Sequence, residues 1–137
     1  MSKSSLSFVL AALLLTPTLS QADVVVIVHP SNKAAIDDDA ITKLFLGQLK
    51  TFPGGAPAIP VDQKTPATAE EFHLKVLNKS DKEVRKVWAR QVFTGGLQPP
   101  PNLDDDEAVV QYVATTPEAI GYVQAAKVTN KVKVVRK

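Results

Sequence analysis

The sequence contains no cysteine, and this absence limits both how the chain folds and what chemistry it can perform. Without disulfides, the hydrophobic core must stabilise the fold unaided. Without a thiol there is no cysteine nucleophile, and a lipid anchor on a mature N-terminal cysteine is excluded. The two histidines, His29 and His73, lack the spacing of a helical zinc pair, so we predict no metal site and no cofactor.

Aromatic residues are few, at 6%, and neither sign of charge dominates. Setting Lys3 aside with the N-terminal segment described below leaves 15 basic side chains against 14 acidic ones, interspersed along the chain. A nucleic-acid surface needs a basic stripe, so we predict no nucleic-acid partner. The sequence also lacks Gly-x-Ser-x-Gly and any serine with an evident base, which argues against nucleophilic catalysis and predicts that the protein is not an enzyme.

Three clusters of acidic residues could suggest a metal site, but their positions favour helix capping. Residues 37–39, 70–71 and 104–107 lie at or near the starts of predicted helices. Carboxylates there accept free N–H groups and complement the helix dipole. None of the clusters has the glycine-punctuated spacing of a calcium loop, so we interpret all three as structural.

Long hydrophobic runs are absent except near the N-terminus. There, Lys3 precedes an apolar run from Leu6 to Leu15, and Ser20-Gln21-Ala22 places small residues where a signal peptidase reads. The run is too short to span a bilayer, so residues 1–22 are predicted to be a cleaved secretory signal peptide. In a bacterium this indicates the periplasm, with residues 23–137 as a single domain that is not embedded in the membrane.

Periodicity and capping signals predict eight elements in the order β-α-β-α-α-α-β-β, which indicates an α/β domain. Strands are expected at residues 24–29, 58–62, 119–123 and 132–135. Helices are expected from Asp38 or Asp39, from Thr65 with Pro66 at its first position, from the capping box at Ser80, and from Asp104–Asp106. The residues predicted to face the core are Ile41, Leu44 and Phe45; Ala69, Phe72, His73, Val76 and Leu77; Val84, Val87, Trp88 and Val92; and Val109, Tyr112 and Val113.

The helix start within 59-IPVDQKTPATAEEF-72 is the best candidate for a ligand site. In open α/β sheets, ligands bind where strands end and helix N-termini converge, because free N–H groups favour anions. Thr65 and Thr68 add two hydroxyls around Pro66, which itself lacks an N–H donor. Two interpretations stay open for this segment: a capped helix and an anion site.

Five blocks in a fixed order carry a resemblance to a known family: VVVIVHPSN, ITKLFLGQLKTFPGG, IPVDQKTPATAEEF, VWARQVFTGGLQPP and PEAIGYV. Together they resemble the small phosphate-ABC-transporter substrate-binding-like proteins, relatives of the periplasmic phosphate-binding protein with its type 2 periplasmic-binding fold. The resemblance covers nearly all of residues 24–135. It implies a single-lobe α/β domain with a mixed sheet flanked by about four helices. The full-length receptor closes two lobes on its anion, so at most half of that cleft is present.

The resemblance also implies a set of site residues. The family's phosphate loop reads Arg-x-Asp-x-Ser-Gly-Thr, and alignment on Phe72 leaves Thr68 as its only match, with Asp62 at the arginine position. A shift of one residue would let Thr65 supply the serine hydroxyl. Arg90 matches the arginine of the family's WxR-x-x-FTG block, and the residues after the first strand are expected to approach the same cleft. The candidate oxyanion ligands are therefore Ser31, Asn32, Thr65, Thr68 and Arg90.

The leading hypothesis is a secreted, periplasmic solute-binding-like protein that binds phosphate or a similar oxyanion in association with ABC-type phosphate uptake. The alternative is a periplasmic interaction or sensory module that reuses the fold without binding phosphate. Its partner would be a sensor or envelope component, bound through the crevice or through the FPGG and LQPPP loops. A permease is a possible partner of a receptor, and a homodimer could complete the cleft.

Overall fold

The β-branched run 24-VVVIV-28 forms the second-from-edge strand of a four-stranded sheet with the order β2-β5-β1-β6. The computed structural model describes residues 23–137, so the predicted signal peptide, residues 1–22, lies outside the described residues. The strands of this sheet are β1 (Val24–Val28), β2 (Ile59–Pro60), β5 (Ala119–Gln124) and β6 (Lys133–Arg136). β1 runs antiparallel to β5 and β6, whereas β2 runs parallel to β5, so the sheet is mixed as expected.

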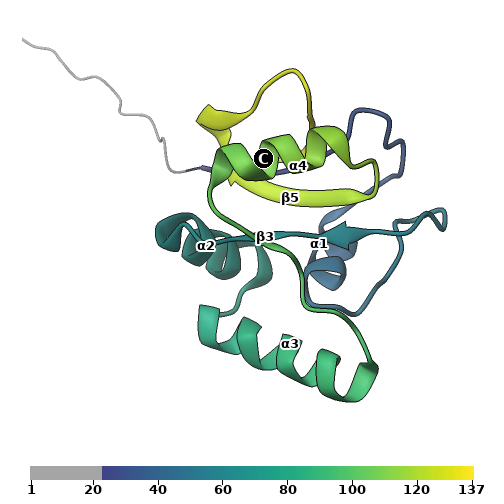
Figure 1. Ribbon diagram of the computed structural model, residues 1–137, viewed down its shortest axis with the longest axis vertical. Helices are drawn as coiled ribbons and strands as arrows, with labels where there is room; N and C mark the ends of the chain where they lie inside the picture. The colour runs from purple at the N-terminus through teal and green to yellow at the C-terminus, as the bar shows by residue number, and fades with distance from the viewer. Residues whose placement is uncertain (1–22) are drawn as a thin grey trace, which may run out of the picture.

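β1 is buried on both faces because helices cover both sides of the sheet. Alternate side chains of a strand point to opposite faces. Val24, Val26 and Val28 enter one core cluster, whereas Val25 and Ile27 enter a second one. The first cluster is completed by α1 and α2 and the second by α4, which lies across β5 at the top of Figure 1.

In the described part of the chain, four α-helices and two short helical turns surround the sheet. They are α1 (Asp38–Phe45), α2 (Pro66–Phe72), the π-helical turn η1 (His73–Leu77), α3 (Asp81–Gly95), α4 (Asp106–Thr115) and the 3-10 turn η2 (Ala125–Lys127). The predicted capping box of α3 is present, since Ser80 and Glu83 exchange side-chain-to-backbone hydrogen bonds. The predicted first position of α2 is also correct, with Pro66 there.

The predicted strand at residues 58–62 is in fact two strands in two sheets. β2 ends at Pro60, and β3 (Asp62–Gln63) pairs in parallel with β4 (Asn102–Leu103) in a separate two-stranded sheet. Val61, between them, is fully buried and donates its N–H to Ile120. The chain therefore leaves the main sheet after Val61 and carries Asp62 toward α2.

Three other expectations are corrected. The N-cap of α1 is Asp37, not Asp38 or Asp39, because the Asp37 carboxylate accepts the Ala40 N–H at 2.8 Å. Val92 is 38% exposed on α3, since only the first part of that helix reaches the core. On α4, Tyr112 is half-buried and packs against the second cluster as predicted, but Val110, which was not predicted to face the core, is buried there too.

α3 lies at the end of the molecule opposite α4 (Figure 1). Two side-chain donors attach it to the end of α1: Trp88 Nε1 to the Phe45 carbonyl at 2.8 Å, and Gln91 Nε2 to the Leu46 carbonyl at 3.2 Å. Gly47, in the left-handed region with φ 73°, allows this approach, since a Cβ atom there would lie 3.1 Å from the Trp88 ring. Within residues 23–137, none of the helices is both long enough and apolar enough to cross a bilayer.

Candidate functional site

A cavity of about 430 Å³ lies where β3, α2 and α3 meet, and we refer to it as the α2 cavity. The chain reaches it after β3 because Lys64 donates its N–H to Leu103 at 2.8 Å, which fixes the turn into α2. Residues of α3 and of the proline-rich loop form its other walls. The lining residues are Asp62, Gln63, Lys64, Pro66, Ala69, His73, Asp81, Val84, Arg85, Trp88, Pro99, Pro100 and Asn102.

His73 is the centre of a polar network at this cavity. Its Nδ1 lies 2.5 Å from Asp81 Oδ1, and its Nε2 lies 3.4 Å from Asp62 Oδ2. The Tyr122 hydroxyl donates to the other oxygen of Asp62. Tyr122 is itself fixed by stacking on Phe72, with ring centroids 3.9 Å apart. The network joins β3, α2, α3 and β5, so His73 does more than the packing role expected from the sequence.

The network shifts the pKa values of His73, Asp62 and Tyr122. Burial alone would lower the pKa of His73, but hydrogen bonds to Asp62 and Asp81 outweigh it and raise that pKa. Burial alone would raise the pKa of Asp62, but hydrogen bonds from His73 and Tyr122 outweigh it and lower that pKa. Burial and the neighbouring Asp62 charge raise the pKa of Tyr122, which keeps its hydroxyl protonated as a donor.

Thr65 and Thr68 have different environments although they lie in the same turn. Thr65 is the N-cap of α2, but its hydroxyl makes no capping hydrogen bond, and its neighbours Lys64 and Pro66 line the cavity. Thr68 is buried, and its hydroxyl accepts a hydrogen bond from Gln124 Nε2 at 3.1 Å. Only the Thr65 hydroxyl is thus available to a ligand without rearrangement.

Ser31 and Asn32 lie apart from the α2 cavity. They line a different cavity of about 470 Å³, together with the FPGG loop. Ser31 Oγ is 2.8 Å from His29 Nδ1, and Asn32 Oδ1 accepts the Ala34 N–H at 2.9 Å. The structure therefore does not bring these two side chains together with Thr65 and Thr68.

Arg85, and not Arg90, is the arginine beside the α2 cavity. In an α-helix, residues three apart share a face, so Arg85 lies on the side of Trp88. Arg90 is about 200° around the helix from Trp88 and is exposed. The three-residue spacing to Trp88 is the sequence signal that could have identified Arg85.

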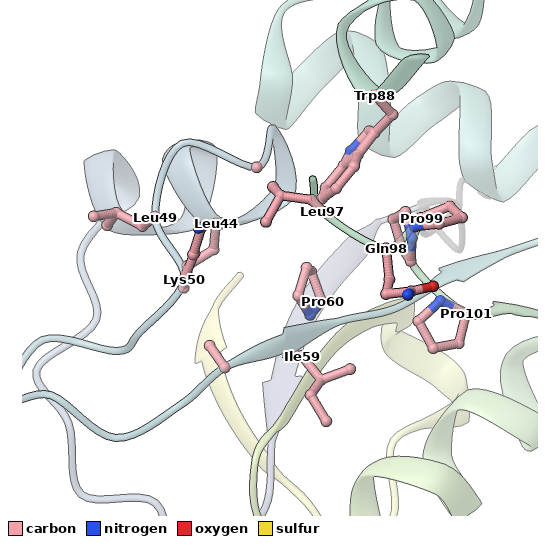
Figure 2. A pocket seen from close by; sticks show the side chains of 13 residues that line it. Leu44, Leu49, Lys50, Ile59, Pro60, Trp88, Leu97, Gln98, Pro99 and Pro101 are labelled. Atoms are coloured by element: carbon pink, nitrogen blue, oxygen red, sulfur yellow. The ribbon is translucent and has the colours of Figure 1, made fainter. Parts of the chain in front are cut away.

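Another cavity, of about 420 Å³, adjoins the α2 cavity across Trp88, and we refer to it as the proline pocket. Figure 2 shows its walls: Trp88 and Leu97 at the top, Pro99 and Pro101 on one side, Ile59 and Pro60 at the base, and Leu44, Leu49 and Lys50 on the other side. Its lining is almost wholly apolar. No group of three or more His, Cys, Asp or Glu side chains within residues 23–137 could hold a metal ion.

The comparisons with known proteins relate the chain to solved structures by fold. No family model matches the chain, and no curated protein matches it. It is similar to an ABC-type phosphate transport receptor from Vibrio cholerae (TM-score 0.63, 13% identity) and to PstS from Borrelia burgdorferi (TM-score 0.58, 14% identity). It is also similar to a substrate-binding protein from Clostridium perfringens solved with bound phosphate (TM-score 0.62, 16% identity).

These similarities cover 82% of this chain but only 44%, 46% and 43% of the three solved chains, in the order given. The chain thus spans less than half the length of the structures it matches. At such identities the likeness concerns the fold alone. The protein therefore has an α/β fold that matches part of the substrate-binding proteins of phosphate transport.

Proposed function

We propose that this chain is a secreted, periplasmic solute-binding-like protein that binds phosphate or a similar oxyanion in the α2 cavity. The observation that carries the proposal is the presence of two cationic side chains from different elements, Lys64 after β3 and Arg85 on α3, in one cavity. Thr65 lies between the lining residues Lys64 and Pro66 in the sequence, and we propose that its hydroxyl, which makes no capping hydrogen bond, donates to the same anion.

The acidic residues of the cavity do not cancel this charge. Asp62 and Asp81 are both within hydrogen-bonding or ion-pairing distance of His73, whose raised pKa favours the imidazolium form. That form offsets one of the two carboxylates, so together with Lys64 and Arg85 the lining keeps a net positive charge. Arg85 has no ion-pair partner within the described residues, and Lys64 pairs with exposed Asp104 at 3.4 Å. An exposed pair of this kind contributes little, so an anion can replace Asp104 at Lys64.

The solved neighbours support the class of ligand, since one of them carries bound phosphate. Binding by half of a two-lobed cleft should be weak. Each charge-assisted hydrogen bond contributes about 1.5–3 kcal/mol net, so two of them, at about 3–6 kcal/mol, correspond to a dissociation constant between a few millimolar and tens of micromolar. A permease, a periplasmic sensor and a second copy of the chain stay predicted partners. Ser31, Asn32, Thr68 and Arg90, the other ligands predicted from the sequence, do not line the α2 cavity and are not part of this proposed site.

The test is an NMR titration of residues 23–137 with sulfate and with phosphate, after unfolding and refolding to remove bound anion. Sulfate keeps its charge near neutral pH, so its binding reports the protein's charges alone. We expect saturable amide shifts at Lys64, Thr65 and Arg85. Arg85→Ala should weaken binding by tenfold or more, because it removes a charge-assisted donor.

Arg90→Ala is the matched control, since it removes the same charge from the same helix outside the cavity. It should leave the affinity unchanged. Equal losses in both variants would place the anion on the outer side of α3 instead. The absence of saturable shifts at tens of millimolar of either anion would refute the proposal and favour the interaction-module alternative.

A further inference from the structure

The proline pocket is shaped by rigid walls. Four of its lining residues are prolines, Pro60 and Pro99 to Pro101, whose rings fix the backbone φ angle. The Trp88 ring is held in place by its hydrogen bond to the Phe45 carbonyl at 2.8 Å and by its packing against Gly47. The cavity therefore exists before any ligand arrives, which is the usual condition of a small-molecule site.

The charge that lines the pocket is of one sign, positive. Of the residues from 23 to 137 that line it, Lys50 is the only charged one, Gln98 adds an amide, and none is a carboxylate. Among residues 23–137 no ion pair includes Lys50. Its backbone is fixed, because its carbonyl accepts the Ala58 N–H at 3.0 Å beside the bridge between Thr51 and Pro57. Lys50 lies on the side of the pocket away from Pro99 and Pro101 (Figure 2).

We infer that the proline pocket is a second ligand site, distinct from the α2 cavity, and that it takes a small amphipathic monocarboxylate. The aliphatic or aromatic body of the ligand packs on Leu44, Trp88 and Leu97, and its carboxylate pairs with Lys50. The volume of about 420 Å³ lies within the range of small-molecule pockets.

The same walls disfavour an added peptide strand. β2 forms the edge of the sheet at this pocket, and Ile59 and Val61 both direct their N–H groups toward β5, to the carbonyls of Glu118 and Ile120. The outward position between them is Pro60, which has no N–H to offer. A peptide adding to this edge would lose a main-chain hydrogen bond there, whereas a small carboxylate needs none.

Trp88 is the only tryptophan of the sequence and lines both the proline pocket and the α2 cavity, so its fluorescence detects a ligand in either and a second probe must locate it. The experiment is a titration of the protein with octanoate and with octylamine, which share a tail and differ in charge. We expect octanoate to shift the Trp88 emission saturably and octylamine to bind more weakly. Amide shifts at Gly47 and Leu97 locate the octanoate independently of the fluorescence, and saturating sulfate should not compete with it.

Lys50→Met should weaken octanoate binding about threefold to fivefold, as expected for one exposed ion pair, and remove the preference over octylamine. Lys86→Met is the matched control, because it removes the same charge from an exposed position of α3 that does not line the pocket. It should change neither affinity. Equal binding of both probes, an unaltered affinity in Lys50→Met, or no response of Trp88, Gly47 and Leu97 to octanoate would overturn the inference.

Discussion

At the scale of single residues, Gly121 shows how closely α4 is packed on one face of the sheet. It lies within β5, opposite Ile27 of β1. A Cβ atom on Gly121 would lie 2.7 Å from Val109 Cγ1 and 2.9 Å from Val61 Cγ2, closer than real Cβ contacts come. The absence of a side chain here lets α4 rest directly on the sheet.

Gly121→Ala should therefore destabilise the fold by overpacking, at a cost of about 1–3 kcal/mol in the free energy of unfolding. Urea unfolding followed by circular dichroism measures this change. The control is Gly95→Ala at the end of α3, where the nearest atom to an added Cβ is the Gln91 side-chain oxygen at 3.5 Å. That change should be neutral or slightly stabilising, because alanine favours helix over glycine. A neutral Gly121→Ala would show that α4 can move away at little cost.

At the scale of elements, His73 holds β3 and the start of α3 to the end of α2. Its two nitrogens face Asp62 on β3 and Asp81 at the first position of α3. The π-helical turn η1 begins at His73 and ends before Asn78, which adopts the left-handed conformation with φ 59°. This sharp stop turns the chain back so that Asp81 can reach the imidazole.

The raised pKa of His73 makes this junction dependent on pH. A histidine whose pKa is higher in the folded state stabilises the fold fully below its unfolded value, and this stability is lost as pH rises through the folded value. The free energy of unfolding should thus fall as pH rises above about 6.5. Urea unfolding at a series of pH values measures this dependence.

His73→Gln should remove that slope, whereas His29→Gln should retain it, since His29 lies outside the network beside Ser31. At acidic pH, the free energy of unfolding should change with pH in the opposite direction. Asp62 has a lowered pKa, so its contribution is present above its unfolded value and is lost as pH falls through the folded one. Identical slopes in both histidine variants would assign the pH dependence to another group.

The helices and strands were the most predictable part of this structure. The capping box at Ser80 and the proline at position 66 are local signals, and both helices begin where these signals indicate. The division of residues 58–62 into β2 and β3 could not be predicted, because it depends on pairing with β5 and with β4, far along the sequence. The exposure of Val92 likewise depends on how far α3 extends beyond the core.

The candidate site was less predictable than the fold. Thr65 was identified because hydroxyls at a helix start are visible in the sequence. Its potential partner Arg85 belongs to another helix, and only the turn after η1 and the attachment of α3 through Trp88 bring it to the α2 cavity. Ser31 and Asn32 were expected in one cleft with Thr65, but they line a separate cavity.

At the scale of the whole molecule, β1 connects the two core clusters. Its alternate residues supply Val24, Val26 and Val28 to one cluster, and Val25 and Ile27 to the other. Detaching β1 would expose buried side chains of both clusters to solvent. β5 does the same, with Ile120 and Tyr122 in the first cluster and Ala119 and Val123 in the second, so the two adjacent strands tie the halves of the domain together.

Residues 23–137 should consequently unfold in one cooperative step. Trp88 reports on the side of α1 and α3, whereas far-ultraviolet circular dichroism reports on all helices and strands. We expect the two urea transitions to coincide, as two-state unfolding requires. A Trp88 transition at lower urea than the circular dichroism transition would show instead that α3 detaches before the rest of the fold.

The two edges of the main sheet have one further consequence, for self-association. On β2 the outward position is Pro60, which cannot donate to a strand from another molecule. On β6, at the other edge, Lys133 is an exposed charged residue, whereas Arg136 pairs with Asp38 at 3.0 Å. Exposed edges are the usual starting points of fibrillar aggregation. Here one edge lacks a donor and the other carries an exposed lysine, and both features disfavour pairing with a strand from another molecule.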